Sequence, residues 1–220
     1  MATPAKGYYL KDGTRVPSVT TIIGKFKPSE NLIDWSWRCG RDGLDYKEVR
    51  DRAANIGKCS HAMVEAHVGG QGIFNFLDEL PDPDDRIKAL NAYNAYLAWR
   101  LANPNIEIFE PEVSLLSETY RFGGTLDAIG REDGKLVLLD WKTSGGTYAD
   151  HVIQLAAYEM LWAENNAEPL TKSHLVRLDK DTSSFEAKTF TDLSIAKRQF
   201  LRLRECYGDA ALIEKQLKAA

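Results

Sequence analysis

The sequence predicts an α/β (α+β) fold in which a mixed central β-sheet is flanked by helices. Apolar and polar residues alternate in five segments between residues 107 and 190, and helical periodicity marks the segments before, between and after them. The 220 residues are 44% hydrophobic and 27% charged, an ordinary composition for a chain that buries its own core. We therefore expect a single domain over residues 1–220, with a hairpin and helices in residues 1–105 and the sheet in residues 106–220.

Short elements are predicted near the N-terminus, followed by two long helices. An Asp12-Gly13 turn favours a hairpin over residues 8–19. Ser18 would then cap a brief helix that follows the hairpin. Helical spacing then covers residues 31–39 and 46–68. After a polar linker at residues 78–85, residues 86–101 predict an amphipathic surface helix with Ile87, Leu90, Asn94, Leu97 and Leu101 at helical spacing.

The second half is predicted to form strands around one helix. A meander is expected over residues 107–117, 120–129 and 135–141, with a polar turn at residues 131–134. A helix over residues 148–165, a hairpin at 173–178 and 185–190, and a final amphipathic helix over 192–207 complete the chain.

Charge and cysteine usage narrow the classes of protein. The net charge of −4 argues against a general affinity for nucleic acid, but residues 171–204 hold eight basic side chains against four acidic ones. That segment would face a nucleic acid or form an ordinary solvated surface. Cys39, Cys59 and Cys206 are too few for a disulfide framework or a four-thiolate metal site, which favours free thiols in a reducing compartment. With no apolar segment of ~20 residues and no signal peptide, we expect a soluble cytoplasmic protein without a membrane partner.

Charged side chains cluster at the ends of two neighbouring predicted strands. Asp127 lies near the end of one strand and Asp140 at the end of the next. Lys142 follows Asp140 by two positions, so both side chains leave the same face while Trp141 points to the other. Helices add residues at four-residue intervals, which share a face: Ala53, Gly57, His61 and Glu65 on one helix, Gln154 and Tyr158 on another. The small residues of the first helix let another element approach closely.

These residue types suit divalent cations. Carboxylates favour Mg²⁺ or Mn²⁺, and one imidazole shifts the preference toward Mn²⁺. We predict two ions, held by His61, Asp127, Asp140 and the backbone carbonyl of Trp141. Lys142 would orient and acidify the attacking water or offset negative charge that develops on phosphorus. The predicted reaction is hydrolysis of a phosphodiester bond.

Each of these residues also has an ordinary explanation when taken alone. A single histidine such as His61 is more often a core or surface residue, and an Asp-x-Lys pattern arises by chance in most proteins of this size. Gln154 and Tyr158 fit any amphipathic helix, and Glu65 could be solvent-exposed. Glu112 could guard a sheet edge. The information lies in their combination and order.

That combination resembles the RecB-type branch of the PD-(D/E)xK nuclease superfamily. The similar motifs are Gly57-x-x-x-His61, Gly124-Thr125-Leu126-Asp127, Asp140-Trp141-Lys142-Thr143-Ser144 and Gln154-x-x-x-Tyr158. Residues 16–23, and residues 32–35 leading to Gly40, resemble the subgroup that contains the mitochondrial genome maintenance exonuclease and related bacteriophage proteins. Leu126-Asp127 replaces the Pro-Asp of the superfamily, as is usual in this branch.

The resemblance implies a restriction-endonuclease-like core and roles for these residues. His61, Asp127 and Asp140 would be metal ligands and Lys142 the catalytic lysine, with Gln154 and Tyr158 in support. Glu112 resembles an acid that some members place near the metals, and Glu65 is a further candidate ligand. Members with an iron–sulfur cluster hold it with four cysteines, so we expect no such cluster in a chain with three.

The expected function is therefore a metal-dependent DNA exonuclease that acts on single-stranded ends. The resemblance places it in phage DNA recombination, repair or end processing in the host cytoplasm, with a recombinase or single-strand-binding protein as a further partner. The N-terminal helices and residues 70–104 would cover the site, and aromatic residues there would stack on bases or belong to the core: Trp35, Trp37, Tyr93, Tyr96 and Trp99. Alternatives are a structure-specific or duplex endonuclease on the same core, and a non-catalytic DNA-binding assembly subunit.

Overall fold

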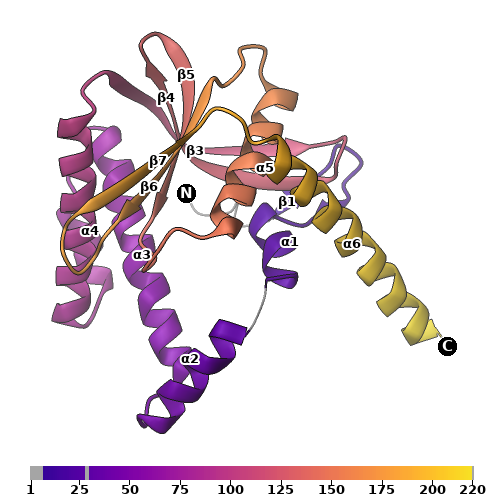
Figure 1. Ribbon diagram of the computed structural model, residues 1–220, viewed down its shortest axis with the longest axis horizontal. Helices are drawn as coiled ribbons and strands as arrows, with labels where there is room; N and C mark the ends of the chain where they lie inside the picture. The colour runs from indigo at the N-terminus through magenta and orange to yellow at the C-terminus, as the bar shows by residue number, and fades with distance from the viewer. Residues whose placement is uncertain (1–6, 28–29, 220) are drawn as a thin grey trace.

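A five-stranded β-sheet lies between two groups of helices in the computed structural model, which describes residues 7–27 and 30–219 (Figure 1). Helices α3 (Tyr46–Val68) and α4 (Pro83–Ala102) pack on one face. Helices α1 (Val19–Lys25), α5 (Ala149–Asn165) and α6 (Ser194–Ala219) pack on the other. The predicted α/β architecture, a mixed sheet flanked by helices, is confirmed.

The sheet has the strand order β3-β4-β5-β6-β7. Strands β3 (Ile106–Ser117), β4 (Phe122–Glu132) and β5 (Lys135–Lys142) form the predicted antiparallel meander. β6 (Lys172–Leu178) is parallel to β5 and antiparallel to β7 (Phe185–Phe190), so the chain crosses over from β5 to β6 through α5. The β4–β5 turn is tight because Asp133 and Gly134 both have positive φ, 49° and 82°.

Each layer of helices buries its own apolar cluster against the sheet. Trp141 of β5 packs with Trp99 of α4 on one face, and Leu138 of β5 packs with Leu155 of α5 and Phe200 of α6 on the other. All five side chains are at most 2% exposed. Burying one side chain of this size contributes about 1.5–3 kcal/mol, so the two clusters hold β5 firmly from both sides.

The N-terminal segment docks on β4. Strands β1 (Tyr8–Tyr9) and β2 (Arg15–Val16) form the predicted hairpin, and Ser18 caps α1 by accepting a hydrogen bond from the backbone N–H of Thr21 at 3.0 Å. Ser18 also forms a parallel β-bridge with Gly123. The Tyr8 ring lies so close to Gly123 that a Cβ there would be 2.2 Å from it, which explains why β4 carries glycine at this point.

Helix α2 (Glu30–Arg41) stands apart from the sheet, beside the N-terminal end of α3 (Figure 1). Its apolar side chains Leu32 and Trp37 are 53% and 65% exposed, and Cys39 is its buried residue among those whose side chains are described. None of the helices in the described parts of the chain has the length and apolarity needed to cross a membrane.

Helix α4 differs from the prediction in its start and in its buried face. It begins at Pro83, with Asp82 as its N-cap, so the predicted linker is partly helical, and a 3₁₀ helix (Phe74–Glu79) precedes it. Ile87 and Leu101, two residues of the predicted apolar stripe, are 55% and 84% exposed. The buried face carries Ala89, Ala92, Tyr93, Ala95, Tyr96 and Trp99 instead. The alanines let α4 approach its neighbours closely at some positions. At the other buried positions aromatic rings, rather than leucines, fill the space between the helix and the rest of the core.

Most basic side chains of residues 171–204 are paired within the protein. Ion pairs join Lys172 to Glu132, Arg177 to Asp179, Lys188 to Glu186 and Lys197 to Glu159. Arg204 donates to the backbone carbonyls of Tyr120 and Arg121. The segment is therefore mainly an internally compensated surface, which favours the ordinary alternative over a nucleic-acid-binding face.

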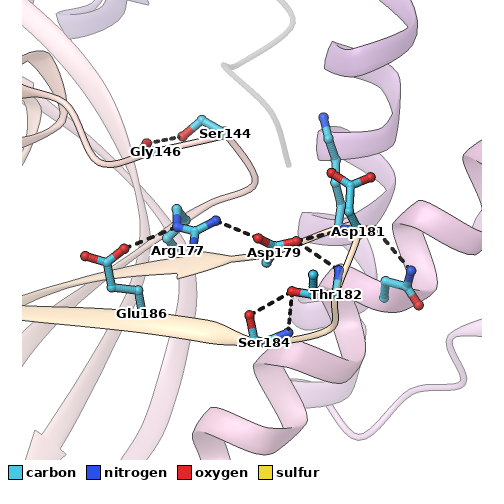
Figure 2. Close-up of polar contacts among 10 residues, drawn as sticks. Ser144, Gly146, Arg177, Asp179, Asp181, Thr182, Ser184 and Glu186 are labelled. Atoms are coloured by element: carbon cyan, nitrogen blue, oxygen red, sulfur yellow. Dashed lines mark hydrogen bonds and ion pairs between the residues drawn. The ribbon is translucent and has the colours of Figure 1, made fainter.

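The turn between β6 and β7 is organised by Asp179 (Figure 2). Its Oδ1 accepts hydrogen bonds from the backbone N–H groups of Asp181 and Thr182, both at 2.9 Å, and its Oδ2 lies 2.9 Å from Arg177 Nη1. The hydrogen bond from Arg177, together with those from the backbone, holds the pKa of Asp179 well below its usual range.

The Asp179→Ala variant is expected to lose about 1–2 kcal/mol of unfolding free energy at pH 7, because it loses these hydrogen bonds to a charged group. The folded-state pKa is lower than the unfolded-state value, so this stabilisation is present above about pH 4 and is lost as the pH falls toward the folded-state pKa. Urea unfolding at pH 7 and pH 3 measures it. Asp181→Ala is the control, expected to change stability by less than about 0.5 kcal/mol; equal losses for both variants would contradict the prediction.

Candidate active site

Several of the residues singled out by the sequence motifs line one cleft of about 640 Å³ between α3, the start of α1 and the central strands. Its walls include His61 and Glu65 from α3, Asp127 from β4, Glu112 from β3 and Tyr158 from α5. Segments that are far apart in the chain therefore meet at the point where the antiparallel ladder between β4 and β5 ends.

Asp127 lies just beyond the last paired residues of that ladder, Ala128 and Leu139. Its Oδ2 accepts a hydrogen bond from the backbone N–H of Trp141 at 2.8 Å, which replaces a ladder bond that β4 does not supply. Its Oδ1 lies 3.8 Å from His61 Nδ1. One oxygen therefore fixes the orientation of the carboxylate, and the other faces the histidine.

Asp140 and Lys142 leave the same side of β5, as the strand periodicity predicted. Asp140 is fully buried, and Lys142 Nζ lies 2.5 Å from its Oδ2. Neither oxygen of Asp140 has a well-aligned hydrogen bond among the described residues, so the ion pair is the main compensation for burying this charge.

Burial raises the pKa of Asp140 to about 7, although the Lys142 charge opposes the rise and Asp127 adds to it. Burial lowers the pKa of Lys142, but the charges of Asp140 and Asp127 outweigh this effect and the net shift is upward. Lys142 is therefore an ammonium ion at neutral pH and can only donate.

Trp141 anchors these two residues from the opposite face. Its ring meets those of Trp99 and Tyr96 edge to face, with centroids 4.9 and 5.4 Å apart. Tyr93, Tyr96 and Trp99 are 6%, 1% and 1% exposed, so of the two alternatives given for them they are core residues and not rings that stack on bases. They lie in the core because α4 needs bulky rings to reach β5. Of the other aromatic candidates, Trp35 is half-buried and Trp37 is exposed.

Helix α3 brings His61 to the strands because Gly57, one turn earlier, allows close approach. A Cβ at Gly57 would lie 2.9 Å from Thr143 Oγ1, directly after Lys142. Burial lowers the pKa of His61, against the raising effects of Asp127 and the Trp141 backbone. His61 is therefore neutral at neutral pH, as a metal-binding imidazole must be.

Gln154 and Tyr158 share a face of α5, and Gln154 Nε2 donates a hydrogen bond to Tyr158 Oη at 2.7 Å. Burial, together with the charges of Asp140 and Asp127, raises the pKa of Tyr158 well above its usual value. The phenol is therefore neutral and lies in the electrostatic field of the two carboxylates. It completes the wall of the cleft opposite α3.

Glu65 and Glu112 also reach the site. Both line the main cleft and a void of about 10 Å³ that His61, Asp127 and Trp141 share. Glu112 has a positive φ of 53°, which is uncommon for a non-glycine residue and redirects its side chain within β3. The structure thus places all the predicted site residues around one location, although Asp140, Lys142 and Gln154 do not line the cleft itself.

The donor set of the site suits a divalent cation in its chemistry. Within the described residues, no three His, Cys, Asp or Glu side chains form a ready metal cluster. The components nevertheless fit a hard cation: a neutral imidazole, carboxylates, a void of about one water volume, and buried Asp140 oxygens without well-aligned hydrogen bonds. His61, Asp127 and Asp140 are the residues that would hold it.

Three residues of the site were not among the predicted site residues. Lys58 lines the cleft, Thr143 touches α3, and Tyr8 Oη lies 2.8 Å from Thr125 Oγ1, which joins the N-terminal hairpin to β4. Thr143 belongs to the motif at residues 140–144, and Lys58 had a usable signal because it lies three positions before His61 and therefore shares its helix face. The position of Tyr8 had no sequence signal.

Known proteins resemble this chain in sequence and in structure. A sequence profile of the PD-(D/E)XK nuclease superfamily matches residues 41–215, about four fifths of the chain. No curated protein matches. Similar solved structures include a candidate exonuclease from Eubacterium rectale, with 15% identity, a TM-score of 0.47, and coverage of 73% of this chain and 66% of that one. Another is the alkaline exonuclease LHK-Exo of Laribacter hongkongensis in complex with dAMP, with 14% identity, a TM-score of 0.39, and coverage of 77% and 92%.

The fold and the profile define a class of protein: this chain is a nuclease. It belongs to the PD-(D/E)XK nuclease superfamily, whose members generally use divalent metal ions. The resemblance inferred from the motifs is confirmed at the level of the superfamily, and the restriction-endonuclease-like core is consistent with the observed sheet.

Proposed function

We propose that this protein is a metal-dependent DNA exonuclease that hydrolyses phosphodiester bonds from single-stranded ends. The observation that carries the proposal is the meeting of Asp127, the Asp140–Lys142 pair and His61 where the ladder between β4 and β5 ends. Two carboxylates, an imidazole and a lysine in that arrangement suit phosphodiester hydrolysis. The family assignment supports DNA as the substrate.

Each residue has a role that follows from its surroundings. Asp127 and Asp140, with His61, would hold two Mg²⁺ or Mn²⁺ ions, and the Trp141 carbonyl would add a ligand. The bound cations would polarise the phosphate and lower the pKa of a water molecule. Lys142, as an ammonium ion, donates to the attacking water or to an oxygen on which charge develops. Its raised pKa favours the ammonium form, which donates a proton rather than accepts one.

The cleft supports an exonuclease acting on a single strand. Tyr8, Ser18, Val19 and Thr20 border it on one side, and Phe76 and Glu79 on another. A volume of about 640 Å³ is within the range of pockets that enclose a small ligand. Such a cleft accepts a nucleotide or two of a strand end more readily than a duplex. We place this activity in phage DNA recombination, repair or end processing, with a recombinase or single-strand-binding protein as partner.

Two alternatives use the same core. An endonuclease would need the cleft to admit a continuous strand, and a non-catalytic DNA-binding subunit would not need the buried pair of Asp140 and Lys142. Keeping a buried ion pair without a chemical role is unfavourable, because replacing it with apolar residues is often neutral or stabilising. The intact pair therefore favours an enzyme.

The test uses end-labelled linear single-stranded and double-stranded DNA and a circular single strand, each with Mg²⁺, Mn²⁺ or EDTA. We expect the linear single strand to be degraded with metal and to survive in EDTA and with Asp140→Ala. The absence of metal-dependent cleavage, or cleavage that Asp140→Ala leaves unchanged, would reject the assignment of a metal-dependent nuclease. Degradation of the circle would favour the endonuclease.

A further inference from the structure

The cleft is acidic, which is unfavourable for a polyanionic substrate. Its lining includes four carboxylates, from Glu65, Glu79, Glu112 and Asp127. Cations bound at Asp127 would reverse the sign only close to the ions. Phosphates on either side of the reacting one need positive charge from the protein itself.

Among the described residues that line the cleft, Lys58 is the only lysine or arginine. It lies on α3 three residues before His61, so the two side chains share a helix face and are about 4.5 Å apart along the helix axis. Lys58 is exposed, and no ion pair joins it to a carboxylate of the described residues. In contrast, Lys142 is paired with Asp140, and Lys27 with Asp150. The ammonium group of Lys58 is thus available to a ligand.

The opposite wall offers neutral groups rather than a second cation. Ser18 is occupied in the cap of α1, where its Oγ accepts from Thr21 N–H and lies 3.0 Å from Thr20 Oγ1. Thr20 itself is exposed. Hydroxyl groups like this one position a phosphate but add no charge. The fixed positive charge of the cleft lining therefore comes from α3.

We propose that Lys58 binds a backbone phosphate of the DNA strand that occupies the cleft, next to the phosphate that is cleaved. The inference rests on the proposed function, since it takes a nucleic acid strand as the ligand. Lys58 contacts substrate without touching the reacting atoms, so it contributes to binding and not to the chemical step. It also offsets the repulsion between the strand and the acidic lining.

Binding of a fluorescent single-stranded oligonucleotide, measured by anisotropy in EDTA between about 50 and 200 mM salt, tests the proposal without catalysis. We expect Lys58→Met and Lys58→Gln to weaken binding about fivefold to tenfold and to reduce the slope of log K against log salt by about 0.7. Lys58→Arg should restore both. With metal present, Lys58→Met should raise KM about tenfold and change kcat less than twofold.

Lys135→Met is the matched control, because Lys135 is an exposed lysine at the far end of β5, about 23 Å from Lys142 along the strand. The proposal would be overturned if Lys58→Met and Lys58→Gln both left the salt slope unchanged. It would also be overturned if they weakened binding no more than Lys135→Met does. Asp127→Asn, assayed in parallel for cleavage, reports on the proposed function independently. Cleavage that survives in Asp127→Asn rejects the nuclease mechanism even if Lys58 binds DNA.

Discussion

The Lys142→Met variant is expected to cleave DNA about 10³-fold more slowly than the wild type while binding it with similar affinity. Lys142 is an ammonium donor, held 2.5 Å from a fully buried carboxylate. Because the ion pair orders it before the substrate arrives, its electrostatic contribution requires no rearrangement during the reaction. Methionine keeps the length and the apolar stem but removes the charge.

Single-turnover cleavage, at a metal concentration that saturates the wild type, separates the chemical step from binding. Lys135→Met again serves as the control on the same strand, and it should cleave at the wild-type rate. Lys142→Arg should not restore activity, because a planar guanidinium cannot occupy the position of a compact ammonium. A Lys142→Met rate within about tenfold of the wild type would show that the lysine is not part of the chemistry.

The Gly57→Ala variant is expected to lose about 10²-fold in cleavage rate, although alanine is the better helix former. The new Cβ would lie 2.9 Å from Thr143 Oγ1, and threonine is stiff about χ1. Helix α3 must therefore move away from β5, which carries His61 away from Asp127. A displacement of about 1 Å is enough to cost this factor.

A second substitution tests this explanation. Outside the helix's own backbone and the neighbouring residues, Thr143 Oγ1 is the only described atom that the Cβ would meet within 4 Å. Gly57→Ala combined with Thr143→Ala should therefore recover most of the rate relative to Gly57→Ala, whereas Thr143→Ser keeps the oxygen and should not. Gly40→Ala in α2 is the control, since a Cβ there meets nothing and should stabilise the fold by about 0.5–1 kcal/mol. Full activity in Gly57→Ala would reject the close-approach argument.

The sheet could be predicted from the sequence because its strands carry strong local signals. The alternation in residues 107–141 and the Asp133-Gly134 turn placed β3, β4 and β5 within a few residues of their observed bounds. The buried face of α4 could not be predicted in this way. Periodicity identifies a stripe, but it does not show which stripe faces the sheet, and Ile87 and Leu101 remained in solvent while three aromatic rings were buried.

Motif spacing predicted which residues form the site, but not the hydrogen bonds that hold them in place. Spacing gave the common face of Asp140 and Lys142 and the four-residue step from Gly57 to His61. The hydrogen bond from Trp141 N–H to Asp127 depends on where the β4–β5 ladder ends, which only the folded register determines. The docking of Tyr8 on β4 is equally invisible in the sequence, because it joins residues 117 positions apart.

That long separation has a consequence for how the enzyme is made. At a synthesis rate of about 5–20 residues per second, Tyr8 leaves the ribosome about 6–23 s before Thr125, its hydrogen-bond partner on β4. The hairpin that holds Tyr8 is too small to be stable alone, so it is not expected to fold until β4, the strand on which it docks, has been synthesised. The hairpin is thus synthesised well before it can dock, and this wall of the cleft forms only after the strand that bears Asp127 has emerged.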